Sequence, residues 1–366
     1  MTFDALTADT VLAREAAGPA PAAARVRRDD MAMIRAAAEL TRDLNAPSVR
    51  TYWVDFVASA LTGYGAMAAT ILVPSLPLQI LAAFVAVLAL YRAGSFIHEL
   101  THVKRGAVPG FWLGWNLVIG IPLLLPSFMY EGIHNLHHAR TRYGTAEDPE
   151  YLPLALMKPW TVPLFVLVSA LGPVALILRY GVLAPLSLLV PPLRTLVVER
   201  WSGLVINPHF RRRAATGTAR SEWLALETAC SLWAMILIAG LVTGFIPFGG
   251  FLVALAIVSG TMVLNQVRTL VAHLWENDGE PMSVTEQYLD SVNVPPPALL
   301  PALWAPVGLR YHALHHLLPG LPYHALAEAH RRIGTALAAD SSYHSASHPG
   351  LPGLVARLVS GTARRA

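Results

Sequence analysis

Cysteine and charge are the two features that this chain has least of. Cys230 is its only cysteine, so it forms no internal disulfide, cysteine-ligated iron–sulfur cluster or multi-cysteine zinc site. Charged residues make up 14% of the chain and hydrophobic residues 54%, whereas soluble domains carry about a quarter charged residues. The composition therefore indicates an integral membrane protein, in which any metal is bound by histidine and carboxylate.

Long runs without charge predict the membrane helices. Residues 56–91 and 228–267 contain no Asp, Glu, Lys or Arg, and each run exceeds a single span of about 20 residues. Both contain proline- or glycine-rich breaks, which predict helical hairpins. Residues 106–130 contain three prolines and residues 159–192 contain Arg179, so both can span or lie in the interface.

The expected fold is therefore an all-α integral membrane protein. It has four transmembrane helices in two hairpins, together with interfacial helices and a cytoplasmic helical cap that holds the histidine-rich segments. We expect a mobile cytoplasmic N-terminal tail at 1–45, because its start lacks the apolar core of a signal peptide. A membrane domain at 46–340 and a C-terminal tail at 341–366 complete the expected division.

Basic residues lie in a few small clusters, and the net charge is only +4. This distribution is typical of positive-inside topology and not of nucleic-acid binding. Because the same polar segments hold most of the arginines and the histidine clusters, we expect the active site to face the cytoplasm. The expected location is the cytoplasmic (inner) membrane of a bacterium.

Nine of the fourteen histidines gather in four places, each just beyond an apolar run. The i, i+4 spacing of the first pair puts two imidazoles on one helical face. Each HxxHH group places an i, i+3 pair on one face and a third ring about 100° round, so that one group can reach two metals. Nine nitrogens exceed the capacity of one ion and favour a dinuclear centre. The candidate ligands are His98, His102, His134, His137, His138, His273, His312, His315 and His316.

The remaining histidines have a more ordinary interpretation, as polar anchors or hydrogen-bonded helix ends. They are His209, His324, His330, His344 and His348.

The three histidine boxes, with two spans before the first and a hairpin between the second and third, resemble the membrane fatty acid desaturase and hydroxylase superfamily. His273 looks like the additional histidine that many desaturases carry shortly after their fourth span. The segment Asp148-Pro-Glu150, soon after the second box, is similar as well. The resemblance extends over roughly residues 50–330.

This resemblance implies two non-haem iron ions, O2 as co-substrate and a lipid or acyl-chain substrate drawn from the membrane. It implies desaturation of a fatty acyl chain, with hydroxylation of an alkyl, sphingolipid or carotenoid chain as the alternative. We expect no fused haem domain, because His348-Pro-Gly-Leu351 departs from the HPGG pattern and has few residues after it. A separate electron donor of the ferredoxin, rubredoxin or cytochrome b5 type, with its reductase, is therefore implied.

Two other classes of function start from the same residues. His98-Glu99-Leu-Thr-His102 also fits the HExxH pattern of an intramembrane zinc metalloprotease, with Glu99 activating water. A metal transporter would place histidines along an ion path. The protease leaves seven histidines unused, and the boxes lie at the ends of spans and not at their centres.

Carboxylates near the boxes are expected to orient the ligand rings by accepting their free N–H groups. Their position in the sequence suggests Glu99, Asp148, Glu276 and Asp278 for this role.

Overall fold

The computed structural model describes residues 28–298 and 300–363, and all their regular elements are helical apart from isolated β-bridges. The α-helices are α2 (Met31–Leu40), α3 (Val49–Leu72), α4 (Leu76–His102), α5 (Phe111–Trp115), α6 (His134–His137), α7 (Thr161–Leu167), α8 (Gly172–Leu178), α9 (Ala184–Ser187), α10 (Pro191–Trp201), α11 (Gly217–Val242), α12 (Phe248–Leu270), α13 (Val284–Asp290), α14 (Pro301–Trp304), α15 (His312–Leu317), α16 (Leu326–Ala336) and α17 (Leu351–Ala363). Short 3-10 or π turns occupy Arg42–Leu44, Asn116–Gly120, Ser127–Met129, Leu154–Leu156, Val168–Leu171, Arg179–Leu183, Tyr323–Ala325 and Ser342–Ala346.

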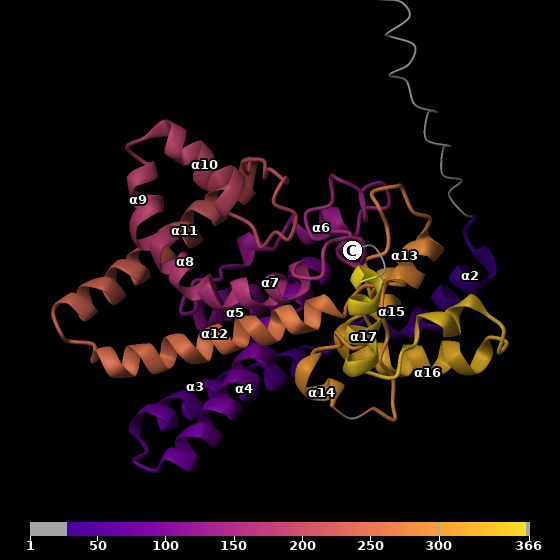
Figure 1. Cartoon of the computed structure of the whole chain (residues 1–366), viewed down its shortest axis with the longest axis horizontal. Helices are drawn as coiled ribbons and strands as arrows, with labels where there is room; N and C mark the ends of the chain where they lie inside the picture. The colour runs from indigo at the N-terminus through magenta and orange to yellow at the C-terminus, as the bar shows by residue number, and fades with distance from the viewer. Residues whose placement is uncertain (1–27, 299, 364–366) are drawn as a thin grey trace, which may run out of the picture.

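The two predicted hairpins are present as α3–α4 and α11–α12. The α3–α4 pair extends from the rest of the molecule as two packed helices, whereas α11 and α12 diverge from their connecting turn and α12 packs against α4 (Figure 1). Ser48 caps α3 by accepting a hydrogen bond from the Thr51 amide. The two helices approach closely at Gly63, where an added Cβ would lie 2.7 Å from the Leu90 side chain. Outward-facing residues such as Leu72 remain exposed, as expected for a lipid-facing surface. The protein is therefore an all-α integral membrane protein.

A fifth apolar stretch, Thr161–Ser187, is also long enough to cross a membrane, so four is not the number of candidate spans in the structure. The chain leaves the helical cap before this stretch and rejoins the cap after α10. The Ala155 amide before it bonds to the Trp275 carbonyl, and the Ile206 and Asn207 amides after it bond to the Pro149 carbonyl. The segment from Thr161 to Trp201, which we call the excursion, therefore begins and ends beside the residues that follow the second histidine box.

The proline-containing run at 106–130 does not form a membrane-spanning helix. Its apolar helix covers Phe111–Gly120, half the length of a span of about 20 residues. Gly110 precedes this helix with a φ of 71°, a left-handed conformation that glycine adopts without a Cβ clash. The segment thus lies against the bundle without crossing it.

The helical cap includes parts of both expected tails. Residues 1–27 lie outside the described part of the chain, but α2 follows directly and buries Met33 against Tyr288 and Tyr343. At the other end, α17 buries Leu358 against Tyr151. Helical structure therefore reaches well into 1–45 and 341–366, because each segment carries an apolar face that the cap covers.

A buried ion network joins the excursion to α11. Arg179 donates to the Glu227 carboxylate at 2.7 Å and to the Ser202 hydroxyl at 2.8 Å. Arg194 contacts the second Glu227 oxygen at 2.7 Å. Arg179 and Glu227 are both buried, so the charge that disfavoured a span in the sequence is neutralised inside the fold.

Replacing Glu227 with alanine should destabilise the protein strongly, because it leaves two arginines without their shared carboxylate. We expect a loss of about 3–5 kcal/mol in the free energy of unfolding. Glu222→Ala is the matched control on the same helix. It breaks an exposed pair with Arg105 and should cost about 0–1 kcal/mol. Denaturation in mild detergent measures both, and equal losses would contradict a structural role for the buried network.

Candidate metal centre

All nine predicted histidines come together from the end of α4, from α6 and α15, and from the residues just after α12. Their nitrogens form two groups, and within each group the ligand atoms lie within 4.8 Å of one another. The first group contains His98, His102, His134, His138 and His315, and the second contains His137, His273, His312 and His316. The five histidines that we interpreted as ordinary polar residues belong to neither group. The structure thus brings together the whole predicted set as two sites of five and four rings.

Each HxxHH box serves both groups, but not with the pairing that we expected. His134 and His138 share the first group while His137 joins the second, and His312 and His316 share the second while His315 joins the first. The i, i+4 pairs therefore stay together and the i, i+3 pairs are divided. The reason is helical geometry, since i, i+4 residues differ by about 40° around the axis and i, i+3 residues by about 60°.

The spacing of the ring nitrogens suits metal binding. His134 and His138 approach through their Nε2 atoms at 3.0 Å, His273 and His312 at 3.1 Å, and His315 lies 3.2 Å from His138. Metal–nitrogen bonds of about 2.1 Å place two ligands of one ion about 3 Å apart. Among the described residues, both ring nitrogens of buried His98 lack a hydrogen-bond partner. These observations fit a pair of bound metal ions.

Carboxylates orient two of the rings from behind. Asp148 accepts from Nδ1 of His137 at 2.9 Å, and Glu150 lies 3.0 Å from Nδ1 of His134. A ring whose Nδ1 donates to a carboxylate presents a free lone pair at Nε2, which is the atom that faces the group. Burial raises the pKa of Glu150 to about 7. The Asp148-Pro-Glu150 segment thus supplies the second box with two ring supports.

A tyrosine and an aspartate from elsewhere in the chain support His273. The Tyr143 hydroxyl lies 2.8 Å from Nδ1 of His273 and donates to Asp290 at 2.7 Å. Ser291 lies 3.2 Å from the same nitrogen. Burial raises the pKa of Asp290 to about 6. The sequence contains no spacing signal for Tyr143 or Asp290, because only the tertiary fold brings them to His273.

His312 differs from these rings because its Nδ1 faces a cation. Arg268, buried in the last turn of α12, lies 2.9 Å from this nitrogen. A guanidinium has only donors, so Nδ1 of His312 is the acceptor here. Arg268 therefore locks the His312 ring and puts a positive charge beside the second group, a role that its place at the end of a span did not reveal.

Burial keeps most of the rings outside the spans neutral. It lowers the pKa of His134, His138, His273, His312, His315 and His316 well below the usual value for histidine. For His137, burial acts in the same direction, but the Asp148 charge outweighs it and the pKa is raised. Neutral imidazole is the form that binds metal, so burial holds these rings in the charge state that binding requires.

Of the four carboxylates expected to orient ligand rings, only Asp148 is hydrogen-bonded to one. Glu99 has one oxygen 3.7 Å from Nδ1 of His98. Its other oxygen accepts from the Tyr52 hydroxyl and the Tyr323 amide. Glu276 pairs instead with Arg357. Asp278 has no hydrogen bond to the nine rings in the described part of the chain.

The surroundings of Glu99 also argue against the zinc protease. In that mechanism the glutamate of HExxH takes a proton from a metal-bound water. Here the Glu99 carboxylate is 2% exposed and turns toward Tyr52 and Tyr323. In addition, His98 and His102 share their group with three rings from the other boxes. The arrangement favours a multi-histidine metal centre over a two-histidine zinc site.

Removing two ligands of the second group should empty one site and spare the other. The double variant His312→Ala/His316→Ala leaves that group with His137 and His273, too few to retain an ion. We expect metal content to fall from about two ions per chain to about one. Elemental analysis of protein purified with iron supplied measures this change. His209→Ala/His344→Ala should keep the full content, and an unchanged content in the first variant would contradict two separate sites.

Replacing Asp148 with asparagine should weaken metal binding without removing a ligand. The amide cannot accept from His137 with the strength of a carboxylate, so the ring loses its orientation. The expected loss of affinity is about 10–100-fold, measured by competition with a chelator. Asp278→Asn is the matched control and should bind as the parent does. Equal affinities in the two variants would show that Asp148 does not support the ligand.

Comparison with known proteins agrees with this geometry. Residues 74–347 match the family described as Fatty acid desaturase. The chain is 52% identical over 322 residues to a protein named ceramide hydroxylase from Caulobacter vibrioides, which covers 88% of this chain and 92% of that protein. No solved structure matches it significantly. The matched region contains all three histidine boxes and His273, and the chain belongs to the fatty acid desaturase family.

Proposed function

We propose that this protein is an oxygen-dependent hydroxylase that acts on a hydrocarbon chain of a ceramide-type lipid. The observation that carries the proposal is the 52% identity to a ceramide hydroxylase over nearly the whole length of both chains. An identity this high over such a length favours the same reaction class. The location is the cytoplasmic membrane of a bacterium, with the histidine cap on the cytoplasmic side, as the arginine distribution suggests.

The nine histidines are proposed to hold two non-haem iron ions, five rings on one and four on the other. When bound, the iron pair supplies the reduction of O2 that makes an unactivated C–H bond reactive. One oxygen atom enters the C–H bond as a hydroxyl, and the other leaves as water with two protons and two electrons. The electrons come from a separate donor of the ferredoxin, rubredoxin or cytochrome b5 type.

Residues around the histidines hold the rings in place and exclude bulk water from them. Asp148 and Glu150 orient the rings of His137 and His134. Asp290 accepts from Tyr143, which contacts His273. The buried positions of His134, His137 and His312 exclude bulk water from the rings. We infer that the lipid chain reaches the metal centre along the spans that end there, α4 and α12.

Desaturation of a fatty acyl chain is the second candidate, and it follows from the family description and the two HxxHH boxes. It uses the same ligands and electrons, but a second hydrogen leaves the lipid and both oxygen atoms leave as water. The two reactions therefore differ in the fate of one oxygen atom.

The products distinguish the two reactions directly. Membranes containing the protein, a ceramide, an electron donor with its reductase and isotopically heavy O2 should yield a lipid that has gained one heavy oxygen atom. Lipid mass spectrometry measures this product, and His315→Ala should yield none. A lipid that has lost two hydrogen atoms and gained no oxygen would favour desaturation. An unchanged ceramide beside a modified fatty acyl lipid would rule out the substrate class.

A further inference from the structure

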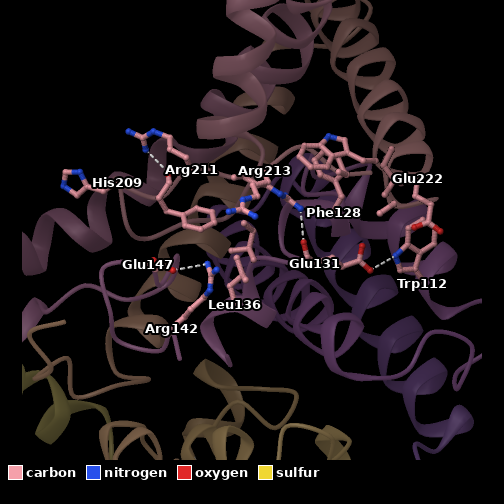
Figure 2. Close-up of a pocket in the computed structure, with 18 of the residues that line it drawn as sticks. Trp112, Phe128, Glu131, Leu136, Arg142, Glu147, His209, Arg211, Arg213 and Glu222 are labelled. Carbon is pink, nitrogen blue, oxygen red and sulfur yellow. Dashed lines mark hydrogen bonds and ion pairs between the residues drawn. The ribbon is translucent and has the colours of Figure 1, made fainter. Parts of the chain in front are cut away.

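A second site lies beside the metal centre but does not include it. A cavity of about 650 Å³ is enclosed by the start of α11, the loop before it and the segment around α6. None of the nine clustered histidines lines it, although Ile133 and Leu136 beside them do. Cavities of this size are typical of small-molecule sites. Figure 2 shows Arg213 among the side chains that line the cavity, while Arg211 lies at its edge on the side of His209.

Three arginines bring positive charge to this cavity with little local compensation. Arg213 is exposed and has no hydrogen bond or ion pair within 28–298 and 300–363. Arg211 uses its Nη1 on the carbonyls of Pro208 and Phe210, which carry no net charge. Arg142 reaches the largely exposed Glu147 only at 3.6 Å.

The arginine between them has a structural role. Arg212 donates to the carbonyl of Glu131 at 2.9 Å and also to that of Ser202. Its guanidinium lies 4.3 Å from the centre of the Trp223 ring. These contacts fasten the loop to the protein, so that Arg211 and Arg213 on either side of Arg212 are held at the cavity.

Of the three carboxylates that line the cavity, Glu131 and Glu222 are paired with other groups, and the largely exposed Glu147 lies 3.6 Å from Arg142. Glu131 accepts from Trp112 at 2.9 Å and from Arg105 at 3.3 Å, and Arg105 also pairs with Glu222. In Figure 2 these acidic groups lie together near Trp112, on the opposite side from Arg211. Among the described residues, Arg211 and Arg213 therefore have no carboxylate partner, and their charge is available to an anion.

The position of the cavity identifies the kind of anion. Trp223 and Leu226, which line it, belong to the first turns of the membrane helix α11, and Phe128 adds an aromatic wall. Arginines at the end of a span lie at the level of lipid phosphates, which attract basic residues. We propose that this cavity binds the phosphate-bearing headgroup of an anionic membrane lipid, with the lipid chains running along α11. Arg211 and Arg213 donate to the phosphate, because guanidinium matches its geometry.

Short-chain lipids test this site without any need for turnover. Native mass spectrometry in mild detergent should show dioctanoyl phosphatidylglycerol binding at least about tenfold more tightly than dioctanoyl phosphatidylcholine. Arg211→Gln/Arg213→Gln should lose this preference. Arg200→Gln/Arg220→Gln removes the same charge from positions that flank the loop but do not line the cavity, and should keep it. Unchanged metal content and thermal stability in both variants establish that they fold.

Three results would overturn the proposal. The two lipids could bind alike, which would show no recognition of the anionic headgroup. The Arg211→Gln/Arg213→Gln variant could keep the preference, which would place the lipid elsewhere. Inorganic phosphate could compete fully at equal concentration, which would indicate a site for soluble phosphate. Since the assay measures binding alone, each result is independent of whether the protein hydroxylates ceramide.

Discussion

The structure depends on imidazole rings that face one another at 3.0–3.2 Å through their Nε2 atoms, an arrangement that fits a bound cation. Burying so many polar rings without a partner is costly. Nitrogen pairs at 3.0–3.2 Å are the spacing at which two ligands share one ion. The rest of the structure is arranged to hold these rings at that distance.

Three histidine boxes that are distant in sequence must come together to place their rings at this spacing. The box on α4 comes directly from a membrane span, whereas α6 and α15 are short helices whose positions depend on the cap. Backbone hydrogen bonds hold the cap together: the Leu274 amide bonds to the Asp290 carbonyl, and Asn293 accepts from the Leu314 amide. The same contacts bring Asp290 to His273, so the orientation of one ligand depends on the packing of the whole cap.

Electrostatics divide the molecule in a way that matches its two proposed sites. Around the metal centre, acidic groups lie behind His134 and His137 and direct their lone pairs inward, and the buried Arg268 faces His312. At the cavity beside α11, Glu131 and Glu222 are paired, whereas Arg211 and Arg213 have no carboxylate partner among the described residues. One face therefore suits cations and the other suits an anionic headgroup, which places lipid recognition and metal chemistry side by side at the end of the spans.

Periodicity and spacing along the sequence determined the membrane class, the two hairpins and the nine clustered histidines, because these depend on local composition and helical geometry. The division of each HxxHH box follows from helical spacing, but the tertiary structure decides which rings from different boxes share a group. The same holds for Tyr143, Asp290 and Arg268, whose partners lie far away in the chain. Arg179 left the nature of residues 159–192 open in the sequence, since only the fold supplies Glu227 to neutralise it. Local pattern thus fixes which residues can bind metal, and long-range packing decides how they are shared and supported.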